Sequence, residues 1–576
     1  MSSSRVVAFL EQDQPKGCAV ADEAIPERRT ATDRDPDAND GRDRGAGDEH
    51  APGGGREHAP GAGGEAGRGP GAAEPETRTG RTGRGEHPEG RRDDLARRRF
   101  LAGAGATGAA GLFAGAPAAP AHAQDRDTEA GGKKLGPKAF DADTLLLVPD
   151  RVLLPKGVVK DHAVLVKKGV FREIGPADEL TAKHPHLDPV RLEGHLLMPG
   201  FVDAHHHLTQ SFGKAQAFGQ PSEIFKTVWE PLEHALDEES AYLAAKLASL
   251  ESLRGGFTTV ADAGTRAPVD VKVVAKGAEE AGIRCVLSKV VSDGKGGKEH
   301  LERWDGHELI HPSLAIPVPE DATAKVLKAT ARMCEEAGAV FQTHVNEHLA
   351  AVERSLKSVG RRPLAHLHHV GALGPATLGA HATLLSPHEI KLLADTGAAI
   401  SYNPVASAWK GNAVAQATTM AAWNVRFGTG TDGTRGDGFR MVDAAESAQR
   451  LTSGLATGDS VCGAGRLWID HATSGSADAV GLKKKTGEIA VGKAADFLLV
   501  DLDVPELTPS WDLEWELVRL AGRDQLTAVV VAGRLRLWRG WPPHWDGPAL
   551  VERAGEVGRA VVRRADIDRV DPTPGD

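Results

Sequence analysis

The chain has 576 residues and a formal net charge of −11 at pH 7. That length exceeds one ordinary domain of about 150 residues. Because no basic block is interleaved with aromatic residues in the part expected to fold, nucleic acid is not an expected partner. Four cysteines, Cys18, Cys285, Cys334 and Cys462, form no Cys-x-x-Cys pair, so the sequence predicts no disulfide framework.

The first sixth of the chain does not have the composition of folded protein. Residues 1–95 are rich in Gly, Pro, Arg, Asp and Glu and poor in large apolar side chains, so we expect a disordered leader. The sequence leaves open whether translation starts further in and whether this leader is made at all.

Residues 96–123 have the layout of an export signal. Arg97-Arg98-Arg99-Phe100-Leu101 opens an Ala- and Gly-rich stretch that ends at Ala121-His122-Ala123, which resembles a twin-arginine signal peptide with its cleavage site. A disordered basic segment before alanines is the alternative. The stretch is too weakly apolar for a membrane span. We therefore expect a periplasmic or extracellular product with no membrane contact after signal removal, or a cytoplasmic one if the signal is not used.

Two strand-rich regions flank the middle of the chain. Residues 140–196 and 486–540 contain short β-branched and apolar runs punctuated by Gly and Pro. We predict that they join in one small β-sandwich domain, followed by a C-terminal helix and tail over residues 541–576.

Between them, over residues 197–485, apolar runs alternate with helical stretches. Eight such runs are found, the fourth of them weak: the run ending at His205/His207, then 257–262, 284–291, 313–317, 339–344, 378–381, 398–403 and 425–432. Eight strands with intervening helices predict an α/β fold of the (β/α)8 TIM-barrel type, with the active site at the carboxyl ends of the strands.

Histidine and aspartate side chains fall at the carboxyl ends of these predicted strands. His205 and His207 lie one residue apart and therefore face the same way in a strand, with His206 facing the opposite way. His344, His381 and Asp432 follow later strands. Three imidazoles and a carboxylate from this group suit a zinc site that keeps one position open. A surface histidine run is the alternative for residues 205–207, but such a tract would not follow Pro-Gly-Phe-Val-Asp.

The motifs Pro-Gly-Phe-Val-Asp-Ala-His-x-His, His344-Val345-Asn346-Glu347, His381, Asn403-Pro404 and Gly430-Thr431-Asp432 resemble the metal-dependent amidohydrolase superfamily. Their order is most similar to its aminohydrolase branch of guanine, cytosine, adenosyl-homocysteine and triazine deaminases or chlorohydrolases.

The resemblance implies a single divalent metal, Zn²⁺ first and Fe²⁺ second, held by His205, His207, His344 and Asp432. It implies that Glu347 shuttles protons, that His381 orients the water, and that Asp432 accepts a proton while touching the metal.

The same residues allow other interpretations. Two-metal relatives carry a bridging lysine after strand four, whereas Lys289 here lies on strand three, so one metal is favoured. His344-Val345-Asn346-Glu347-His348 also fits the inverted zinc-protease motif, which needs both histidines on one helix. His366, His368 and His369 are interpreted as packing or solvent-facing side chains.

Substrate contacts are predicted in the loops at the carboxyl ends of the strands. The candidates are Gln210, Trp229, His348, Trp409 and Arg435, with Asp437 a similar guess. We expect Asn403 to fix the loop before Pro404, and Gly430 to allow a close backbone approach near the metal.

The sequence therefore predicts a hydrolase acting on carbon–nitrogen bonds other than peptide bonds. Its expected reaction is deamination of a nitrogen heterocycle of the purine, pyrimidine or triazine type, by attack of hydroxide held at the metal. One alternative is hydrolysis of a cyclic or exocyclic amide, as in the related imidazolonepropionases. Another is a non-catalytic exported metal-binding protein. The expected partner is a small-molecule substrate, and assembly into a homo-oligomer is left open.

Overall fold

The computed structural model describes residues 129–130, 133–220, 223–458 and 463–570. All of them belong to one unit of the chain, Gly115–Asp576. The leader at 1–95 and the signal at 96–123 lie outside the described residues, so both stay predictions. Within the described residues, no helix combines the length and the apolar character needed to cross a membrane.

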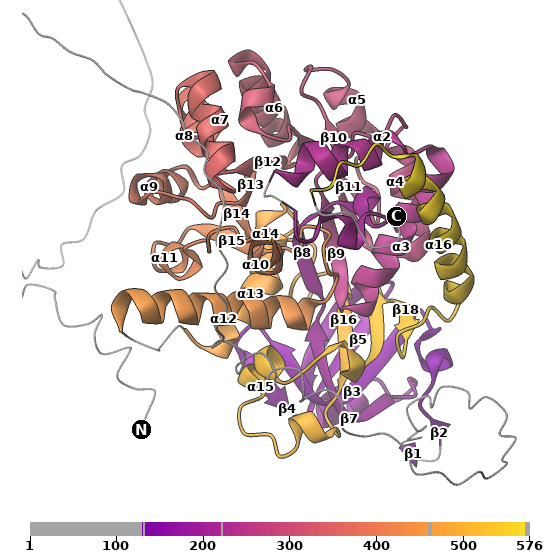
Figure 1. The fold of residues 1–576 in the computed structure, drawn as a ribbon. Helices are drawn as coiled ribbons and strands as arrows, with labels where there is room; N and C mark the ends of the chain where they lie inside the picture. Colours follow the sequence, from indigo (N-terminus) through magenta and orange to yellow (C-terminus); the bar gives the residue numbers. More distant parts are fainter. Residues whose placement is uncertain (1–128, 131–132, 221–222, 459–462, 571–576) are drawn as a thin grey trace, which may run out of the picture. The chain divides into compact units, whose positions relative to one another are not determined.

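Eight parallel strands form the barrel, and their order in space follows their order in the chain (Figure 1). They are β8 (Phe201–His206), β9 (Phe257–Asp262), β10 (Arg284–Val290), β11 (Ile310–Ala315), β12 (Phe341–Val345), β13 (Thr377–His381), β14 (Ala399–Tyr402) and β15 (Arg426–Thr429). Every residue of β8 and β9 is buried, as expected for strands covered on both faces. The predicted (β/α)8 barrel is confirmed.

Helices lie between these strands and after the last of them. They are α2 (Glu230–His234), α3 (Glu238–Arg254), α4 (Lys272–Ala281), α5 (Gly297–Arg303), α6 (Ala324–Ala337), α7 (Leu349–Val359), α8 (Pro363–Val370), α9 (Pro387–Thr396), α10 (Pro404–Lys410), α11 (Ala417–Ala422), α12 (Gly438–Thr457), α13 (Gly465–Ala472) and α14 (Ser474–Ala479). Local sequence sets their ends. In α9, Ser386 and Glu389 form a reciprocal capping box, and Gly397 ends the helix in the left-handed region at φ 71°.

The strands outside the barrel form a second, mixed sheet. Its order is β18-β17-β16-β7-β3-β5-β6, with β4 paired to β3. The first segment supplies β3 (Thr144–Leu154), β4 (Gly157–Lys160), β5 (His162–Lys167), β6 (Val170–Pro176) and β7 (Val190–Pro199); the second supplies β16 (Phe497–Asp501), β17 (Leu526–Val531) and β18 (Arg534–Trp538). Separate from this sheet, β1 (Glu129–Ala130) pairs with β2 (Lys133–Lys134). Two further helices, α1 (Ala177–Lys183) and α15 (Leu513–Arg519), lie in the same segments.

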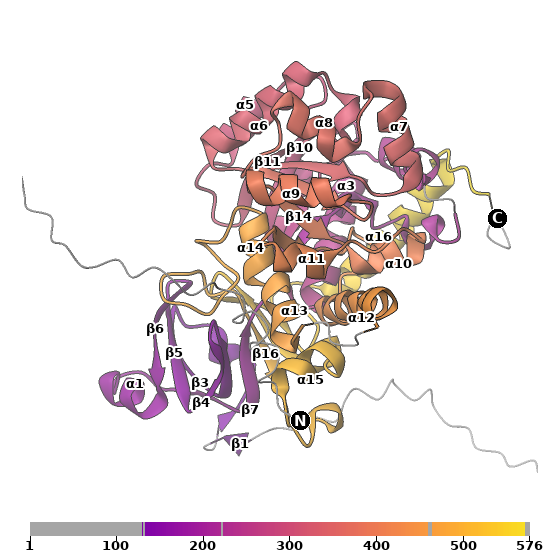
Figure 2. The same cartoon turned by 90° about the vertical axis from the view of Figure 1, so that its left-hand side faces the viewer.

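The two flanking segments meet through β7 and β16, where Leu197 pairs with Leu499 in an antiparallel ladder. The pairing gives one connected sheet, so the arrangement as a sandwich stays a prediction. Only Gly200 separates β7 from β8, and an added side chain there would collide with Thr258. The small sheet therefore continues directly into the strand that carries His205. Figure 2 shows this sheet with β7 of the first segment beside β16 of the second.

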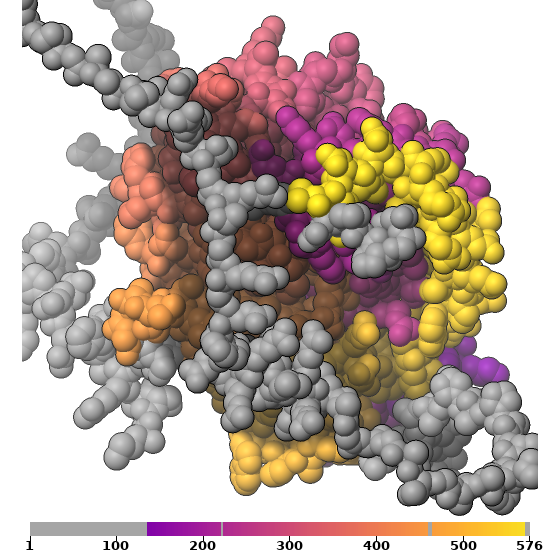
Figure 3. Space-filling view, in the orientation of Figure 1, coloured from indigo at the N-terminus to yellow at the C-terminus, as the bar shows by residue number. Residues whose placement is uncertain are grey.

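The C-terminal helix α16 (Gly547–Arg564) lies along α3. Arg553 Nη2 donates to Glu239 Oε1 at 2.7 Å, and Arg564 Nε donates to the Ala235 carbonyl at 3.0 Å. In the space-filling view this yellow segment covers the magenta helices of the first βα units (Figure 3). The C-terminal helix thus packs on the outside of the barrel.

Candidate metal centre and active site

Four side chains that could bind a metal converge at the carboxyl ends of the barrel strands. His205 and His207 come from β8 and its end, His344 from β12, and Asp432 from the loop after β15; one donor atom of each lies within 4.8 Å of the other three. Asp432 Oδ1 is 3.3 Å from His205 Nε2 and 3.4 Å from His207 Nε2. His206 faces away, with Nε2 3.5 Å from the Ser252 hydroxyl. The structure therefore brings together the four ligands predicted from the sequence.

The hydrogen bonding of His344 prepares its other nitrogen for a metal. Nδ1 lies 2.7 Å from the Pro317 carbonyl oxygen, which can only accept, so Nδ1 carries the proton. Nε2 then presents a lone pair, the arrangement that ligating histidines ordinarily have. Burial lowers the pKa of His344 well below its usual value, and that of His207 in the same direction. Both imidazoles are therefore neutral at pH 7, the form that binds a metal.

The tautomer of His381 is the opposite of that of His344. Asn403 Nδ2 donates to His381 Nδ1 at 3.1 Å, while Asn403 Oδ1 accepts from the Ser401 hydroxyl. The proton of neutral His381 is therefore on Nε2, 3.7 Å from Glu347 Oε1. Burial lowers the pKa of His381 to about 4. The fully buried ring thus presents a neutral N–H donor to the site, and Asn403 serves to orient it.

The backbone approaches closely behind Asp432, as predicted for Gly430. A side chain on Gly430 would lie 2.4 Å from Asn403 Oδ1 and 2.9 Å from the His205 backbone nitrogen, so only glycine fits. The Asp432 N–H donates to the His205 carbonyl at 2.8 Å. This bond ties the carboxylate ligand directly to the strand that carries the first histidine.

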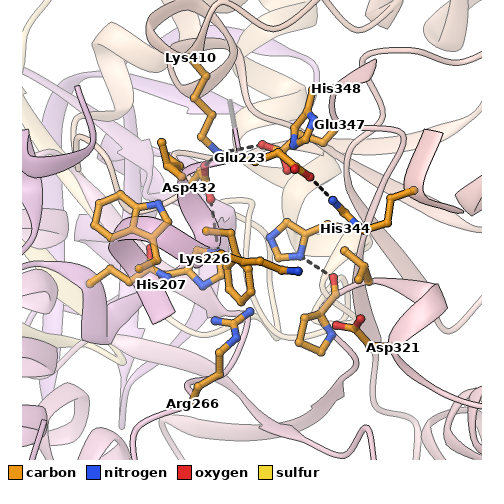
Figure 4. Close-up of a pocket in the computed structure, with 17 residues that line it drawn as sticks. His207, Glu223, Lys226, Arg266, Asp321, His344, Glu347, His348, Lys410 and Asp432 are labelled. Carbon is orange, nitrogen blue, oxygen red and sulfur yellow. Dashed lines mark hydrogen bonds and ion pairs between the residues drawn. The ribbon is translucent and has the colours of Figure 1, made fainter. Parts of the chain in front are cut away.

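Glu347 and Asp432 share one cation. Lys410, the last residue of α10, places Nζ 2.8 Å from Glu347 Oε1 and 2.6 Å from Asp432 Oδ2 (Figure 4). Burial alone would raise the pKa of both carboxyls. At Glu347 this effect is outweighed by His381 and Lys410, and at Asp432 it is outweighed by Lys410. Both pKa values fall below the usual range, so both acids are ionised at neutral pH.

A cavity opens beside this group. It is lined by His207, Gln210, Glu223, Ile224, Phe225, Lys226, Trp229, Arg266, Pro317, Val318, Asp321, His344, Glu347, His348, Arg354, Lys410 and Asp432. Three of the predicted substrate contacts, Gln210, Trp229 and His348, are among these residues. His348 also caps α7, because its Nδ1 accepts from the Ala351 N–H at 3.2 Å.

The other two predicted contacts, Trp409 and Arg435, are not among the lining residues. Trp409 turns its indole N–H to the Thr434 hydroxyl at 3.0 Å and packs on Phe218, which takes it away from the cavity. Arg435 is exposed to solvent. Asp437 instead caps α12 by accepting from the Arg440 N–H.

The sequence reasoning missed several residues of the cavity, above all Lys410 and Arg266. Lys410 follows β14 by eight residues, and Arg266 follows β9 by four. Arg266 lies in the loop after β9 and Lys410 at the end of the short helix after β14, so position after the carboxyl end of a strand was the available signal. The fully buried Glu233 accepts from Arg266 Nη1 at 2.9 Å and from the Thr209 hydroxyl at 2.8 Å, which holds Arg266 at the wall of the cavity.

The structure bears on two alternatives, the zinc-protease motif and the bridging lysine. The inverted zinc-protease motif is wrong, because His344 lies on β12 and His348 caps the next helix, so the two do not share a helical face. Lys289 is half-buried on β10 and is not among the residues that line the cavity. Of the three other histidines, His366 is buried on α8, which fits a packing role.

Comparison with known proteins agrees with this geometry. The family model described as "Amidohydrolase family" matches residues 196–536, more than half of the chain. The chain belongs to the amidohydrolase family.

Relatives of this amidohydrolase carry deaminase names. It is 29% identical to a 5-methylthioadenosine/S-adenosylhomocysteine deaminase of Syntrophobacter fumaroxidans, over 68% of this chain and 92% of that protein. It is 26% identical to a 5'-deoxyadenosine deaminase of Methanosarcina mazei, over 71% of this chain and 95% of that protein. Among solved structures, an adenosine deaminase from Xanthomonas campestris with bound zinc is similar, with a TM-score of 0.67 and 25% sequence identity. The match covers 73% of this chain and 98% of that chain.

The donor set of the amidohydrolase fits a divalent metal, with zinc the first candidate. Three imidazoles and one carboxylate are ligands that zinc prefers. His205 Nε2 is buried and has no hydrogen-bond partner among the described residues, as a nitrogen reserved for a metal would be. His205, His207, His344 and Asp432 are therefore proposed to hold one metal ion.

Proposed function

We propose that this amidohydrolase removes the exocyclic amino group of a nitrogen heterocycle as ammonia. The observation that carries the proposal is the meeting of the four-ligand group with Glu347 and His381 at the wall of one cavity. In the reaction, water adds to the ring carbon that bears the amino group, the carbon–nitrogen bond breaks, and the products are the oxo heterocycle and ammonia.

A divalent ion held by the four ligands would supply Lewis-acid polarisation of water. The protein supplies the proton transfers. Glu347 is ionised and can accept a proton from water. The same carboxylate, at the wall of the cavity, can then pass that proton to the leaving amine. The Nε2–H of His381 donates toward the same region and would steady the attacking oxygen.

The deaminase names of the relatives narrow the substrate class. The proteins from Syntrophobacter, Methanosarcina and Xanthomonas are all named for an adenine-bearing nucleoside. Apolar and aromatic side chains on the cavity wall, among them Phe225, Trp229 and Val318, suit the faces of a heterocycle. We therefore place adenine nucleosides first among the substrates, ahead of free pyrimidines and triazines.

A panel of substrates tests the proposal. Purified, zinc-loaded protein is assayed for ammonia release from adenosine, 5-methylthioadenosine, S-adenosylhomocysteine, guanine, cytosine and aminotriazines. The expected result is stoichiometric ammonia and oxo product from at least one adenine nucleoside. Protein that contains one tightly bound metal yet releases ammonia from none of these compounds would show that the reaction is not this deamination.

A further inference from the structure

One ammonium group joins the two acids of the site. Lys410 Nζ contacts Asp432 Oδ2 and Glu347 Oε1 at the same time, and its side chain is only 8% exposed. Asp432 is a proposed metal ligand and Glu347 the proposed proton carrier, so Lys410 bridges the two parts of the machinery. Figure 4 shows the lysine pointing from α10 between these carboxylates.

The contact divides the two oxygens of Asp432 between different partners. Oδ1 faces His205 and His207, whereas Oδ2 faces Lys410. Asp432 itself has a backbone φ of 57°, in the left-handed region. The ammonium group thus holds the carboxylate on the side away from the imidazoles.

Glu347 shows the same division. Oε1 accepts from Lys410 Nζ at 2.8 Å and from the Asn412 amide at 3.3 Å, whereas His381 Nε2, at 3.7 Å, makes no hydrogen bond to it. Oε2 has no hydrogen bond to any other residue that the structure describes. The two hydrogen bonds to Oε1 thus fix the carboxylate so that Oε2 is left for water and substrate.

We propose that Lys410 is a positioning residue that orients Asp432 and Glu347 and, through its charge, limits how tightly the metal binds. The inference about Glu347 rests on the proposed function, whereas the inference about the metal does not. A cation against Asp432 opposes the binding of a dication to the same carboxylate, because like charges at close range repel strongly in a buried site. Removing it will strengthen metal binding while impairing turnover.

The test is Lys410→Met, which keeps the length of the side chain and removes its charge. Zinc affinity is measured by competition with a fluorescent chelator, which needs no substrate. Steady-state kinetics then separate kcat from KM. We expect zinc to bind at least about 10-fold more tightly and kcat to fall at least about 10-fold with KM little changed. Damage to the fold would instead weaken zinc binding and turnover together.

Two controls complete the experiment. Lys410→Arg keeps the charge, and its zinc affinity should stay within about 3-fold of the parent. Lys289→Met removes a barrel lysine that does not line the cavity, and it should change neither quantity. If Lys410→Met is poorly soluble, Lys410→Gln gives the same reading. Unchanged or weaker zinc binding in the neutral variants would overturn the role in metal affinity, and unchanged kcat would overturn the positioning role. Absence of deaminase activity in the parent protein would leave the zinc result intact.

Discussion

Three residues at the centre of the site adopt backbone conformations that side chains ordinarily avoid. His381 has a φ of 73°, Asp432 of 57° and Asn346 of 49°. Each such conformation costs about 1–3 kcal/mol and persists only where surrounding contacts enforce it. Asn346 shows these contacts: its side-chain Nδ2 donates to Glu389 Oε1 at 2.8 Å, and its side-chain Oδ1 accepts from the Leu364 N–H at 3.1 Å. The strained backbone therefore lowers the stability of the fold, and it directs the side chains of His381 and Asp432 toward one point.

Glu347 gives the sharpest test at the residue scale. Glu347→Gln keeps the shape and the contacts with Lys410 and Asn412 but cannot accept a proton. We expect turnover to fall by about 100- to 10,000-fold, the usual contribution of general acid–base catalysis. Zinc content, measured by elemental analysis, should stay at the parent value, since Glu347 is not among the four grouped ligands. A variant that retains its metal and its full rate would remove Glu347 from the mechanism.

At the scale of elements, a buried ion pair joins the barrel to the small sheet. Arg284 on β10 donates to both oxygens of Asp496, which directly precedes β16, at 2.9 and 3.0 Å, and both side chains are fully buried. Asp496 also accepts from the Thr486 hydroxyl and the Ala532 N–H. Every oxygen of the carboxylate is therefore satisfied, which is the condition under which a buried pair is tolerated.

Breaking this pair should be costly because it leaves a buried charge without compensation. Arg284→Met is expected to lower the free energy of unfolding by about 3–5 kcal/mol, measured by urea denaturation. Adding Asp496→Asn removes the orphaned charge and should restore at least about 1 kcal/mol. Arg303→Met, which breaks the exposed pair with Asp270, should cost less than about 1 kcal/mol. Equal losses in the buried and exposed variants would contradict the argument.

The barrel and the proposed ligands were predictable because two signals coincide in the chain: an apolar run typical of a strand, and a polar residue at the end of that run. Each apolar run ends near a polar residue at the active-site edge, as at His205, His344 and His381, and strand periodicity alone separates His206 from its neighbours. Gly430 could likewise be read from its place before Thr431-Asp432, and its crowded surroundings confirm the reading.

The cavity wall was less predictable, because it depends on loop paths that periodicity does not encode. Trp409 and Lys410 are neighbours on one short helix, yet only Lys410 reaches the cavity. Which of the two turns inward depends on how α10 leaves β14 and on the pairing of Trp409 with Thr434. The burial of Glu233, which holds Arg266, is likewise a property of the folded loops.

At the scale of the whole molecule, the barrel closes between its first and last strands. The strand pairing described here runs from β15 to β8 without a ladder between those two. Side chains and loop backbone close the gap instead: Asp203 on β8 accepts from the Thr431 N–H and hydroxyl, and the Asp432 N–H donates to His205. The proposed ligands lie on both sides of the same gap, so a bound metal would hold the barrel shut.

Metal removal should therefore destabilise the whole protein and not the site alone. At a free zinc concentration 100 times the dissociation constant, binding adds about 2.7 kcal/mol to the stability, so dialysis against a chelator should lower Tm by several degrees. Adding back one equivalent of zinc should restore the original Tm in scanning calorimetry. In His344→Ala, which lacks a ligand, Tm should respond weakly to zinc, whereas His366→Gln, a buried histidine outside the site, should keep the full response. A Tm that is the same with and without zinc would mean that the four side chains, although gathered in one place, do not close the barrel through a metal.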